Sequence, residues 1–333
     1  MKKNLFIGID ISKKTLDVVV YSGEKKNKDE VDYLKVTNNS EGFKEIFKWL
    51  RAQKIKPADC VFGMENTGLY GFDLRLFLET KKIRYSVFSP LDLKMSMGLV
   101  RGKNDKVDAS RIAYHTWLHR DELAYSKLAG SNILRLRDLL SERKRFVKQL
   151  AEYKALLTDN KGREITTTLI RYEKMKEILE EELKEVEKEM EHLIAEDEEL
   201  LKNYQLLMSI KGIGNVNAIS TLVHTNNFKA FENARQYACY VGVAPFDYQS
   251  GTSIKGRKQV SRLGAKELKA DLSQAAASAV TWDKEMKSYF ERKSSEGKPY
   301  GVILNAVKFK IICRMFAVIK RGTPFVELQN YRN

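Results

Sequence analysis

Residues 6–21 read FIGIDISKKTLDVVVY, and this stretch decides the fold. Two runs rich in β-branched residues, Phe6–Ile11 and Leu16–Tyr21, flank a short polar spacer that is typical of a hairpin. Val31–Val36 predicts a third strand directly afterwards. The chain therefore begins with three consecutive strands.

Helices and strands alternate beyond the third strand, up to about Ala129. Asn39 or Ser40 is expected to cap a helix that runs to about Gln53, with apolar residues on one face. The further predicted elements are a strand at Cys60–Met64, a helix at Gly68–Thr80, a strand at Tyr85–Phe88 and a helix at Asp105–Arg120. This order predicts a mixed α/β sheet with helices on its faces.

The rest of the chain reads as helical. Residues 131–202 are nearly free of glycine and proline, and two long apolar patterns flank a turn at Asn160-Lys161-Gly162. The second pattern, from Met175 to Leu193, has nearly heptad spacing, which predicts a helical hairpin or an intermolecular coiled coil. Residues 203–333 combine glycine-rich turns with amphipathic helices, including Leu263–Val280 and Tyr300–Lys320. We therefore predict three regions, at residues 1–130, 131–202 and 203–333.

The charge of the chain is positive and unevenly distributed. The net charge is +15, yet Glu173–Lys202 holds thirteen acids and only five lysines. Residues 251–333 carry seventeen basic and seven acidic residues. A regional excess of this kind attracts polyanions, so we expect nucleic-acid partners. A lysine-rich protein without such a partner is the simpler alternative.

The three cysteines argue for a reducing compartment. Cys60, Cys239 and Cys313 are far apart, fit no disulfide framework or zinc knuckle, and have apolar neighbours, so we expect all three to be buried and reduced. No apolar run approaches the length of a membrane span, so we expect no membrane partner. The cytoplasm is the simplest compartment.

Four carboxylates stand at places where packing alone does not explain them. Asp10 lies in an apolar strand and Glu65 just beyond another, while Asp105 and Asp108 share one face of a predicted helix. If they converge, they form an oxygen-rich site that suits Mg²⁺ and phosphodiester chemistry. Taken singly, Asp105 and Asp108 could interact favourably with the helix dipole at the start of their helix, and Glu65 could be a capping acid. Asp17 and Asp92 are nearby acids to which we assign no role.

Ser209–Ala218 fits a helix-hairpin-helix turn. Gly212 and Gly214 would let backbone amides approach a phosphate, and Lys211 would add charge. An ordinary helix–helix turn without a ligand is the alternative.

The motifs together resemble a known family. Gly8-Ile9-Asp10-Ile11-Ser12-Lys13, Met64-Glu65-Asn66-Thr67-Gly68 and Asn104-Asp105-Lys106-Val107-Asp108-Ala109 look like the DEDD, RuvC-like domain of the insertion-sequence transposases known as bridge-RNA-guided recombinases. The segment from Tyr240 to Gly264, with Gln249-Ser250-Gly251, resembles the C-terminal transposase domain of that family.

The resemblance implies a function and its residues. It implies an RNase H/RuvC-like first domain in which Asp10, Glu65, Asp105 and Asp108 bind Mg²⁺ or Mn²⁺. It makes Ser250 the nucleophile of DNA cleavage and strand exchange. It also implies donor and target DNA, a structured guide RNA and a dimeric or tetrameric assembly.

The residues around Ser250 suit this role chemically. A glycine follows the hydroxyl, and four cations close by in sequence could hold a scissile phosphate, namely Lys255, Arg257, Lys258 and Arg262. The hydroxyl needs activation and no histidine is near in sequence, so a metal or carboxylate of the acidic site is expected to provide it. The simpler alternative for Ser250 is a turn hydroxyl.

Three rival functions remain on sequence grounds. A sugar-kinase or actin-like ATPase also begins with a strand, an aspartate and a hairpin, but Ser12 stands where a phosphate-admitting glycine is expected. A metal-dependent RuvC-like junction nuclease would not need Ser250. A non-enzymatic nucleic-acid scaffold would not need the carboxylates.

Overall fold

The computed structural model describes residues 5–23, 32–96, 104–162, 166–246, 249–250, 254–255, 259–261 and 263–326; at 249–250 and 254–255 it describes the backbone alone. The chain divides into two compact units, Met1–Leu128 and Ala129–Asn333, which are described separately. None of the helices in the described ranges has a stretch apolar and long enough to cross a membrane. The predicted region boundaries near residues 130 and 202 stay predictions.

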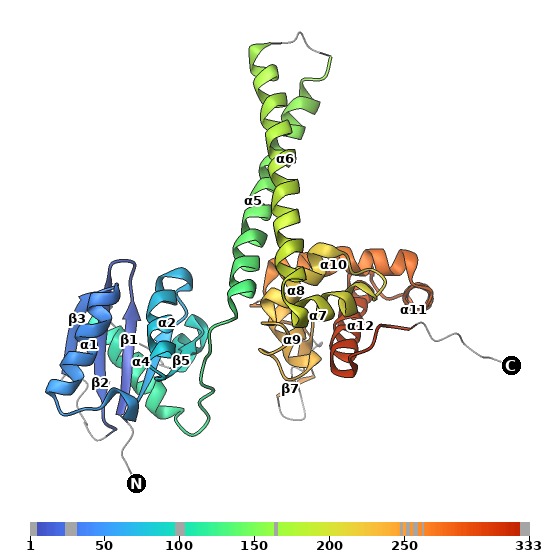
Figure 1. The fold of residues 1–333 in the computed structure, drawn as a ribbon. Coiled ribbons are helices and arrows are strands. Elements are labelled where there is room, and N and C mark those ends of the chain that lie inside the picture. The colour runs from blue at the N-terminus through green and yellow to red at the C-terminus, as the bar shows by residue number, and fades with distance from the viewer. Residues whose placement is uncertain are drawn as a thin grey trace. The chain divides into compact units, whose positions relative to one another are not determined.

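The first unit is a five-stranded mixed sheet with the strand order β3-β2-β1-β4-β5 (Figure 1). Its strands are β1 (Leu5–Ile11), β2 (Thr15–Tyr21), β3 (Asp32–Thr37), β4 (Cys60–Glu65) and β5 (Arg84–Phe88). β1 pairs antiparallel with β2 and parallel with β4, so the hairpin and the alternating part of the chain join at β1. The predicted strands are confirmed to within about one residue at each end.

Helices cover both faces of this sheet. One face carries α1 (Ser40–Ala52) and α2 (Phe72–Thr80), which bury their apolar residues against alternate residues of the strands. Asn39 caps α1 as predicted, because its side chain accepts hydrogen bonds from two backbone amides of the first turn. Gly68–Gly71 forms a short 3-10 turn, so α2 begins four residues later than predicted. The short helix α3 (Pro90–Ser96) was not predicted.

Helix α4 (Asp105–Leu118) covers the other face, and two glycines allow it to lie close to the strands. A Cβ on Gly8 of β1 would stand 2.1 Å from the carbonyl oxygen of Ala109, and one on Gly63 of β4 would stand 1.9 Å from Thr116 Oγ1. Gly8 and Gly63 are register partners on adjacent strands. Together they form a flat strip that fits the small side chains of α4.

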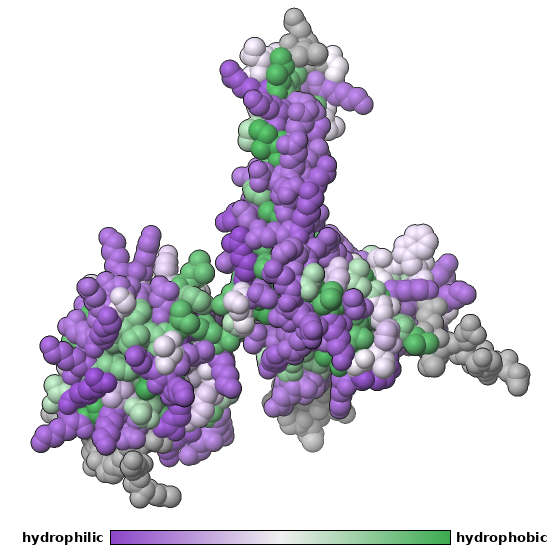
Figure 2. All heavy atoms as spheres, viewed as in Figure 1, coloured by the Kyte–Doolittle hydropathy of each residue, from purple (hydrophilic) through white to green (hydrophobic). Residues whose placement is uncertain are grey.

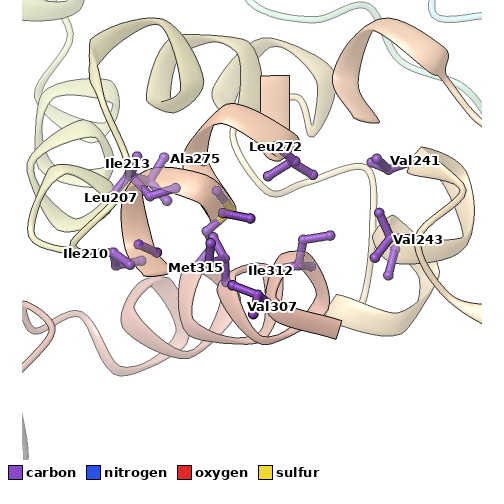
Figure 3. Packing of buried hydrophobic residues seen from close by; sticks show 14 of the residues in the cluster. Leu207, Ile210, Ile213, Val241, Val243, Leu272, Ala275, Val307, Ile312 and Met315 are labelled. Atoms are coloured by element: carbon purple, nitrogen blue, oxygen red, sulfur yellow. The ribbon is translucent and has the colours of Figure 1, made fainter. Parts of the chain in front are cut away.

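The second unit is helical. Its helices are α5 (Ser131–Asp159), α6 (Thr167–Ala195), α7 (Glu198–Met208), α8 (Asn215–His224), α9 (Ala234–Val241), α10 (Lys266–Trp282), α11 (Lys284–Ser295) and α12 (Tyr300–Arg321). Of these, α9 and α11 were not predicted individually. Apolar residues of α7 to α10 and α12 form one buried core, part of which is drawn in Figure 3.

Helices α5 and α6 pack against each other as an arm. Three ion pairs join them, from Arg135 to Glu189, from Arg143 to Glu187 and from Lys154 to Glu180. Near α7 and α8 the arm has a buried apolar core, which includes Val186 and Met190 of α6. Farther out, apolar side chains remain at the surface of the arm (Figure 2), namely Val147, Leu156, Ile170, Met175 and Ile178.

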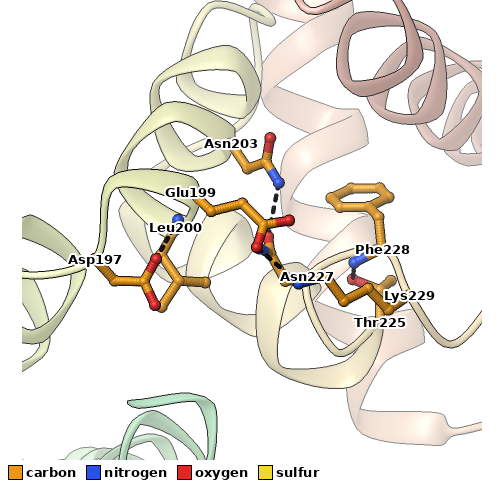
Figure 4. A network of polar contacts seen from close by, with 8 residues as sticks. All are labelled: Asp197, Glu199, Leu200, Asn203, Thr225, Asn227, Phe228 and Lys229. Atoms are coloured by element: carbon orange, nitrogen blue, oxygen red, sulfur yellow. Dashed lines mark hydrogen bonds and ion pairs between the residues drawn. The ribbon is translucent and has the colours of Figure 1, made fainter. Parts of the chain in front are cut away.

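A polar network fixes the turn that follows α8 (Figure 4). Asn226, Asn227 and Phe228 all have positive φ, which is costly for residues other than glycine. The buried amides of Asn203 and Asn227 lie 2.8 Å apart, and the amide of Phe228 donates to Thr225 Oγ1. These hydrogen bonds hold the left-handed turn, so they fix the direction in which the chain leaves α8.

One cysteine departs from expectation. Cys60 is buried and Cys239 is partly buried, but Cys313 of α12 is exposed. The prediction that all three are buried is therefore wrong for Cys313. Its apolar neighbours in sequence lie on other faces of a helix, so they do not cover it.

Candidate active site

A row of carboxylates crosses three adjacent strands of the first unit. Asp10 of β1 stands directly opposite Asp17 of β2 in the antiparallel pairing. On the other side, Ile9 pairs with Met64, so Glu65 at the end of β4 comes next to Asp10. The row therefore runs Asp17, Asp10, Glu65 across the sheet.

The row lies on the face that α4 covers. Side chains alternate between the two faces of a strand, so Asp10 shares a face with Gly8, and Glu65 shares one with Gly63. Both glycines face α4. The first turn of α4 contains Asp105 and Asp108, and Asn104 caps that turn by accepting from the amide of Lys106. The close packing of α4 on the glycine strip brings its acidic first turn to the carboxylate row.

The pKa of Asp10 shows that the acids converge. Burial, followed by the negative charges of Asp108, Asp105, Asp17 and Glu65, raises the pKa of Asp10 to about 6. The other three acids singled out in the sequence therefore lie close enough to Asp10 for their charges to act on it. The structure adds Asp17, which the sequence left without a role.

Cations and a phenol partly offset this negative charge. Asp17 is fully buried, and Tyr33 Oη donates to its Oδ1 at 2.5 Å. Lys35 Nζ lies 3.4 Å from Asp17 and 3.6 Å from Asp105, while Arg111 pairs with Asp108 at 2.7 Å. Burial, followed by the hydrogen bond to Asp17, raises the pKa of Tyr33 to about 12, so Tyr33 stays a donor.

The donor set fits a hard divalent cation in chemistry and charge. Carboxylate oxygens are the ligands that Mg²⁺ and Mn²⁺ favour. Asp17 Oδ2 is buried without a hydrogen bond, and the raised pKa of Asp10 reflects first its burial and then the negative charge of four neighbouring acids. Within the described ranges, however, no three His, Cys, Asp or Glu side chains already stand at coordinating distances. The acids converge without forming a closed ligand shell.

Ser250 lies in the second unit, on a nested hairpin. The outer pair joins β6 (Pro245–Phe246) to β9 (Gln259–Val260), and the inner pair joins β7 (Gln249–Ser250) to β8 (Ile254–Lys255). The backbone of Ser250 therefore lies in a strand, opposite Ile254. Three other predicted residues of this segment, Arg257, Lys258 and Arg262, lie outside the described residues.

The base of this hairpin is held by the helices around it. Gly242 ends α9 in the left-handed conformation with φ 76°, and its backbone packs against Gly264. Lys269 Nζ donates to the carbonyl of Gly242 at 2.8 Å, and Asn305 donates to the carbonyl of Val243 at the same distance. The segment that leads into β6 is thus fixed by α10 and α12.

The predicted helix-hairpin-helix turn joins α7 to α8. Gly212 has φ +94°, and a Cβ there would stand 2.6 Å from the carbonyl oxygen of Ala275, so this glycine serves the packing on α10. Gly214 precedes α8 and has open space beside it. Of the two glycines, only Gly214 leaves room for a ligand, and Lys211 stands at the turn between the helices.

Two kinds of residue escaped the sequence analysis. Asp17 was recoverable, because a hairpin that pairs Ile11 with Leu16 also pairs Asp10 with Asp17. Lys269 and Asn305 gave no signal, since each acts on a backbone carbonyl far away in sequence.

Comparison with known proteins agrees with both units. A family model described as a transposase, the DEDD domain of IS110-type elements, matches residues 7–160. A second, described as the transposase IS116/IS110/IS902 family, matches residues 204–291. Together the two models match about seven tenths of the chain.

Two curated relatives are matched over most of their own length. The chain is 27% identical to the pilin gene-inverting protein of Moraxella bovis over 329 residues, which cover 96% of this chain and 97% of that protein. It is 23% identical to the transposase for insertion sequence element IS1533 of Leptospira borgpetersenii over 265 residues, covering 71% of this chain and 73% of the relative. The resemblance to insertion-sequence transposases is confirmed, and the chain is a DNA transposase enzyme of the IS110 family, with a DEDD transposase domain followed by an IS116/IS110/IS902-type transposase domain.

Proposed function

We propose that this transposase cleaves and exchanges DNA strands through a phosphoserine intermediate at Ser250, with a divalent cation held by Asp10, Glu65, Asp105 and Asp108. The observation that carries the acidic half of the proposal is the convergence of these four carboxylates, which the raised pKa of Asp10 reports. Bringing five acids together costs free energy unless cations offset it, so such a cluster favours a cation-binding role.

The acids of the first unit have different parts in this proposal. Asp10 lies in the middle of the row and, with its raised pKa, would give up a proton on binding a cation. Asp17 is already held by Tyr33 and Lys35, so we assign it to positioning Asp10 rather than to binding. Asp105 and Asp108 are brought in by α4 and release Lys35 and Arg111. A bound Mg²⁺ or Mn²⁺ would stabilise negative charge on phosphoryl oxygens.

Ser250 provides the nucleophile in the second unit. Its hydroxyl oxygen attacks the scissile phosphorus and its proton passes to solvent. The bond from phosphorus to a deoxyribose oxygen breaks, and that oxygen takes up a proton from solvent. A serine–phosphate diester forms, and a second strand's hydroxyl later displaces the serine in the reverse sense. Because each step exchanges one phosphate ester for another, rejoining the DNA strands needs no nucleoside triphosphate. The hairpin supports this role, since helices α10 and α12 hold its base.

The partners follow from charge and from the resemblance. We propose that nucleic-acid phosphates are contacted by the turn at Lys211 and Gly214 and by the cations Lys255, Arg257, Lys258 and Arg262. Gly212, which packs against α10, gives that turn its shape. Donor DNA, target DNA and a structured guide RNA are the proposed partners, and the cytoplasm is the proposed compartment. The Moraxella relatives are named as inverting a gene. Inversion is strand exchange between two sites of one DNA, which is the same class of reaction.

We further propose that the α5–α6 arm joins copies of the chain. The inner half of the arm fills its own core, but the outer half leaves five large apolar side chains at its surface. Ile170 is 59% exposed, and Met175 and Ile178 lie on the next two turns of α6. A second arm would bury this surface as a coiled coil does.

The phosphoserine can be trapped directly. Full-length protein is incubated with Mg²⁺, guide RNA and labelled DNA that carries the ends of the element, and the reaction is stopped in denaturant. We expect a covalent protein–DNA adduct, and peptide mass spectrometry should place the nucleotide on Ser250. Cleaved DNA without any adduct would instead identify the chain as a metal-dependent, RuvC-like nuclease that uses water.

A further inference from the structure

Lys308 of α12 is the unusual residue of the second unit. Its exposed fraction is only 7%, and few charged side chains are buried so deeply. The other polar or charged side chains found buried in the described ranges, such as Asp17, Asn203 and Asp283, each make a side-chain hydrogen bond. Lys308 makes neither a hydrogen bond nor an ion pair with any part of the chain that the structure describes. Its Nζ is not among the fully buried atoms that lack a hydrogen bond, so the ammonium reaches an accessible space while the rest of the side chain is buried. A largely desolvated ammonium that finds no partner among the described residues is costly.

The charge that acts on Lys308 is of the same sign. Burial lowers the pKa of Lys308, and the ammonium of Lys269 lowers it further. The acids of α10 are engaged elsewhere, since Asp271 accepts from Ser220 of α8 and Glu267 pairs with Lys144 of α5. Residues 300–321, which form α12, include no acid. The described residues thus supply two neighbouring ammonium groups and no counter-ion for them.

A cavity of about 310 Å³ lies beside Lys269, the lysine whose charge acts on Lys308. It is lined by Val241, Val260, Ser261, Gly264, Lys266 and Lys269. Lys266 and Lys269 come from the first turn of α10, where Ala265 provides no side-chain cap, so backbone amides are left for another acceptor. Cations, uncapped amides and a cavity together make a setting that favours an anion.

The cavity lies at the base of the Ser250 hairpin. Val260 belongs to β9, which pairs with β6 in the outer ladder of that hairpin. Lys269 donates to the carbonyl of Gly242, and Asn305 donates to that of Val243. Asn305 stands one turn before Lys308 on α12. The unpartnered lysine and the cavity are therefore connected through the same short segment that leads into the hairpin.

We propose that Lys308, Lys269 and Lys266 form a binding site for a phosphate group of the nucleic-acid backbone at the base of the Ser250 hairpin. This proposal rests on the proposed function, because it takes nucleic acid as the polyanion that provides the phosphate. A phosphate there supplies the counter-ion that the described residues lack, and it anchors one nucleic-acid strand beside the hairpin.

Inorganic phosphate is the first probe, because it needs no knowledge of the target sequence. The melting temperature of the full-length protein is measured in sodium phosphate and in sodium chloride at equal ionic strength. We expect a rise that is specific to phosphate in the wild type and absent in Lys308→Met. In chloride alone, Lys308→Met should melt at the wild-type temperature or above it, because the substitution keeps the volume and removes a buried charge.

Lys310→Met is the matched control. It lies two residues away on the same helix, where its ammonium stands over the ring of Tyr289, so it should keep the rise caused by phosphate. A phosphate-specific rise that persists in Lys308→Met overturns the site. So does a wild type that responds alike to phosphate and chloride.

Nucleic acid provides the second measurement. The slope of log affinity against log salt should fall by about one unit in Lys308→Met for single-stranded or duplex DNA. An unchanged slope, with an adduct still formed at Ser250, overturns this site and leaves the proposed function intact. A phosphate effect that depends on Lys308, in a wild type that forms no adduct, supports this site and removes the phosphoserine mechanism alone.

Discussion

Asp10 and Asp17 face each other across the antiparallel pair β1–β2, and among the residues that the structure describes only Asp17 has close hydrogen-bonding or ion-pair partners. Tyr33 and Lys35, both on β3, contact the carboxylate of Asp17, the first by a hydrogen bond and the second as an ion pair. Asp10 is left in the middle of five carboxylates with a pKa of about 6. This asymmetry makes Asp10 the proton-linked member of the site, and two predictions follow from it.

The first prediction concerns stability without metal. The pKa of Asp10 is raised from 3.8 to about 6 in the fold, so the fold gains stability while Asp10 is protonated and loses it as pH rises through 6. Asp10→Asn cannot ionise and should stabilise the metal-free protein by about 1–2 kcal/mol at pH 7.5 after solvent screening. The difference should vanish near pH 4. Urea unfolding in chelator at both pH values measures it.

Asp73→Asn is the control for this comparison. Asp73 is an exposed acid in the first turn of α2, on the other face of the sheet, and its removal should not raise stability at pH 7.5. A loss of stability in Asp10→Asn at pH 7.5 would show that ionised Asp10 is already compensated in the fold.

The second prediction concerns metal affinity. Since Asp10 must lose its proton to bind a cation, Mg²⁺ affinity should rise by up to about tenfold per pH unit below pH 6 and level off above pH 7. Asp108→Asn should weaken binding at every pH. Calorimetry at pH 5, 6 and 7.5 in buffers of different ionisation enthalpy reports both the affinity and the proton released. Affinity that stays constant over this range would remove Asp10 from the ligands.

The third prediction tests the glycine strip that brings α4 to the sheet. Gly8→Ala places a methyl group 2.1 Å from Ala109 O and 2.3 Å from Ala113 N, so α4 must move. We expect a loss of about 1–3 kcal/mol in the free energy of unfolding and a larger loss of Mg²⁺ affinity than of stability. Gly301→Ala, with nothing within 4 Å of its Cβ, should keep both. Undiminished Mg²⁺ affinity in a folded Gly8→Ala variant would mean that α4 does not carry metal ligands.

The sequence predicted the first unit well because its signals are local. The apolar, β-branched runs around Asp10 indicate strands by their composition. Asn39 indicates the start of α1, because its side chain is of the capping type. The acidic site needs long-range information as well. Only the register of β1 with β4 and the close approach of α4 at Gly8 bring Asp108 to Asp10. Lys308 could not be found at all, since its burial and its lack of a partner depend on the packing of α12.

The fourth prediction concerns the arm, and the structure decides which residues test it. Val186 looks like part of an intermolecular seam in the sequence, but it is buried in the core of its own chain, so charging it would unfold the arm. Met175 and Ile178 are at the surface. Met175→Glu/Ile178→Glu should lower the mass measured by light scattering, while circular dichroism stays that of the wild type. Lys188→Glu, an exposed change on the same helix, should keep the mass. A wild type that is monomeric at micromolar concentration, with and without nucleic acid, contradicts the proposed assembly.

The last prediction concerns Ser250 itself. The hydroxyl is required for attack but not for affinity, so Ser250→Ala should bind DNA with wild-type affinity and salt dependence while adduct and cleavage fall below detection. Ser250→Cys should keep at most a trace of cleavage, because a thiolate attacks phosphorus poorly. Ser253→Ala, three residues along the same segment, is the matched control and should keep most of the activity. Asp108→Asn should also lose cleavage, since the proposal needs both the acidic site and the serine. Cleavage by Ser250→Ala at the wild-type rate would show that water is the nucleophile, and the carboxylate row would then carry the reaction alone.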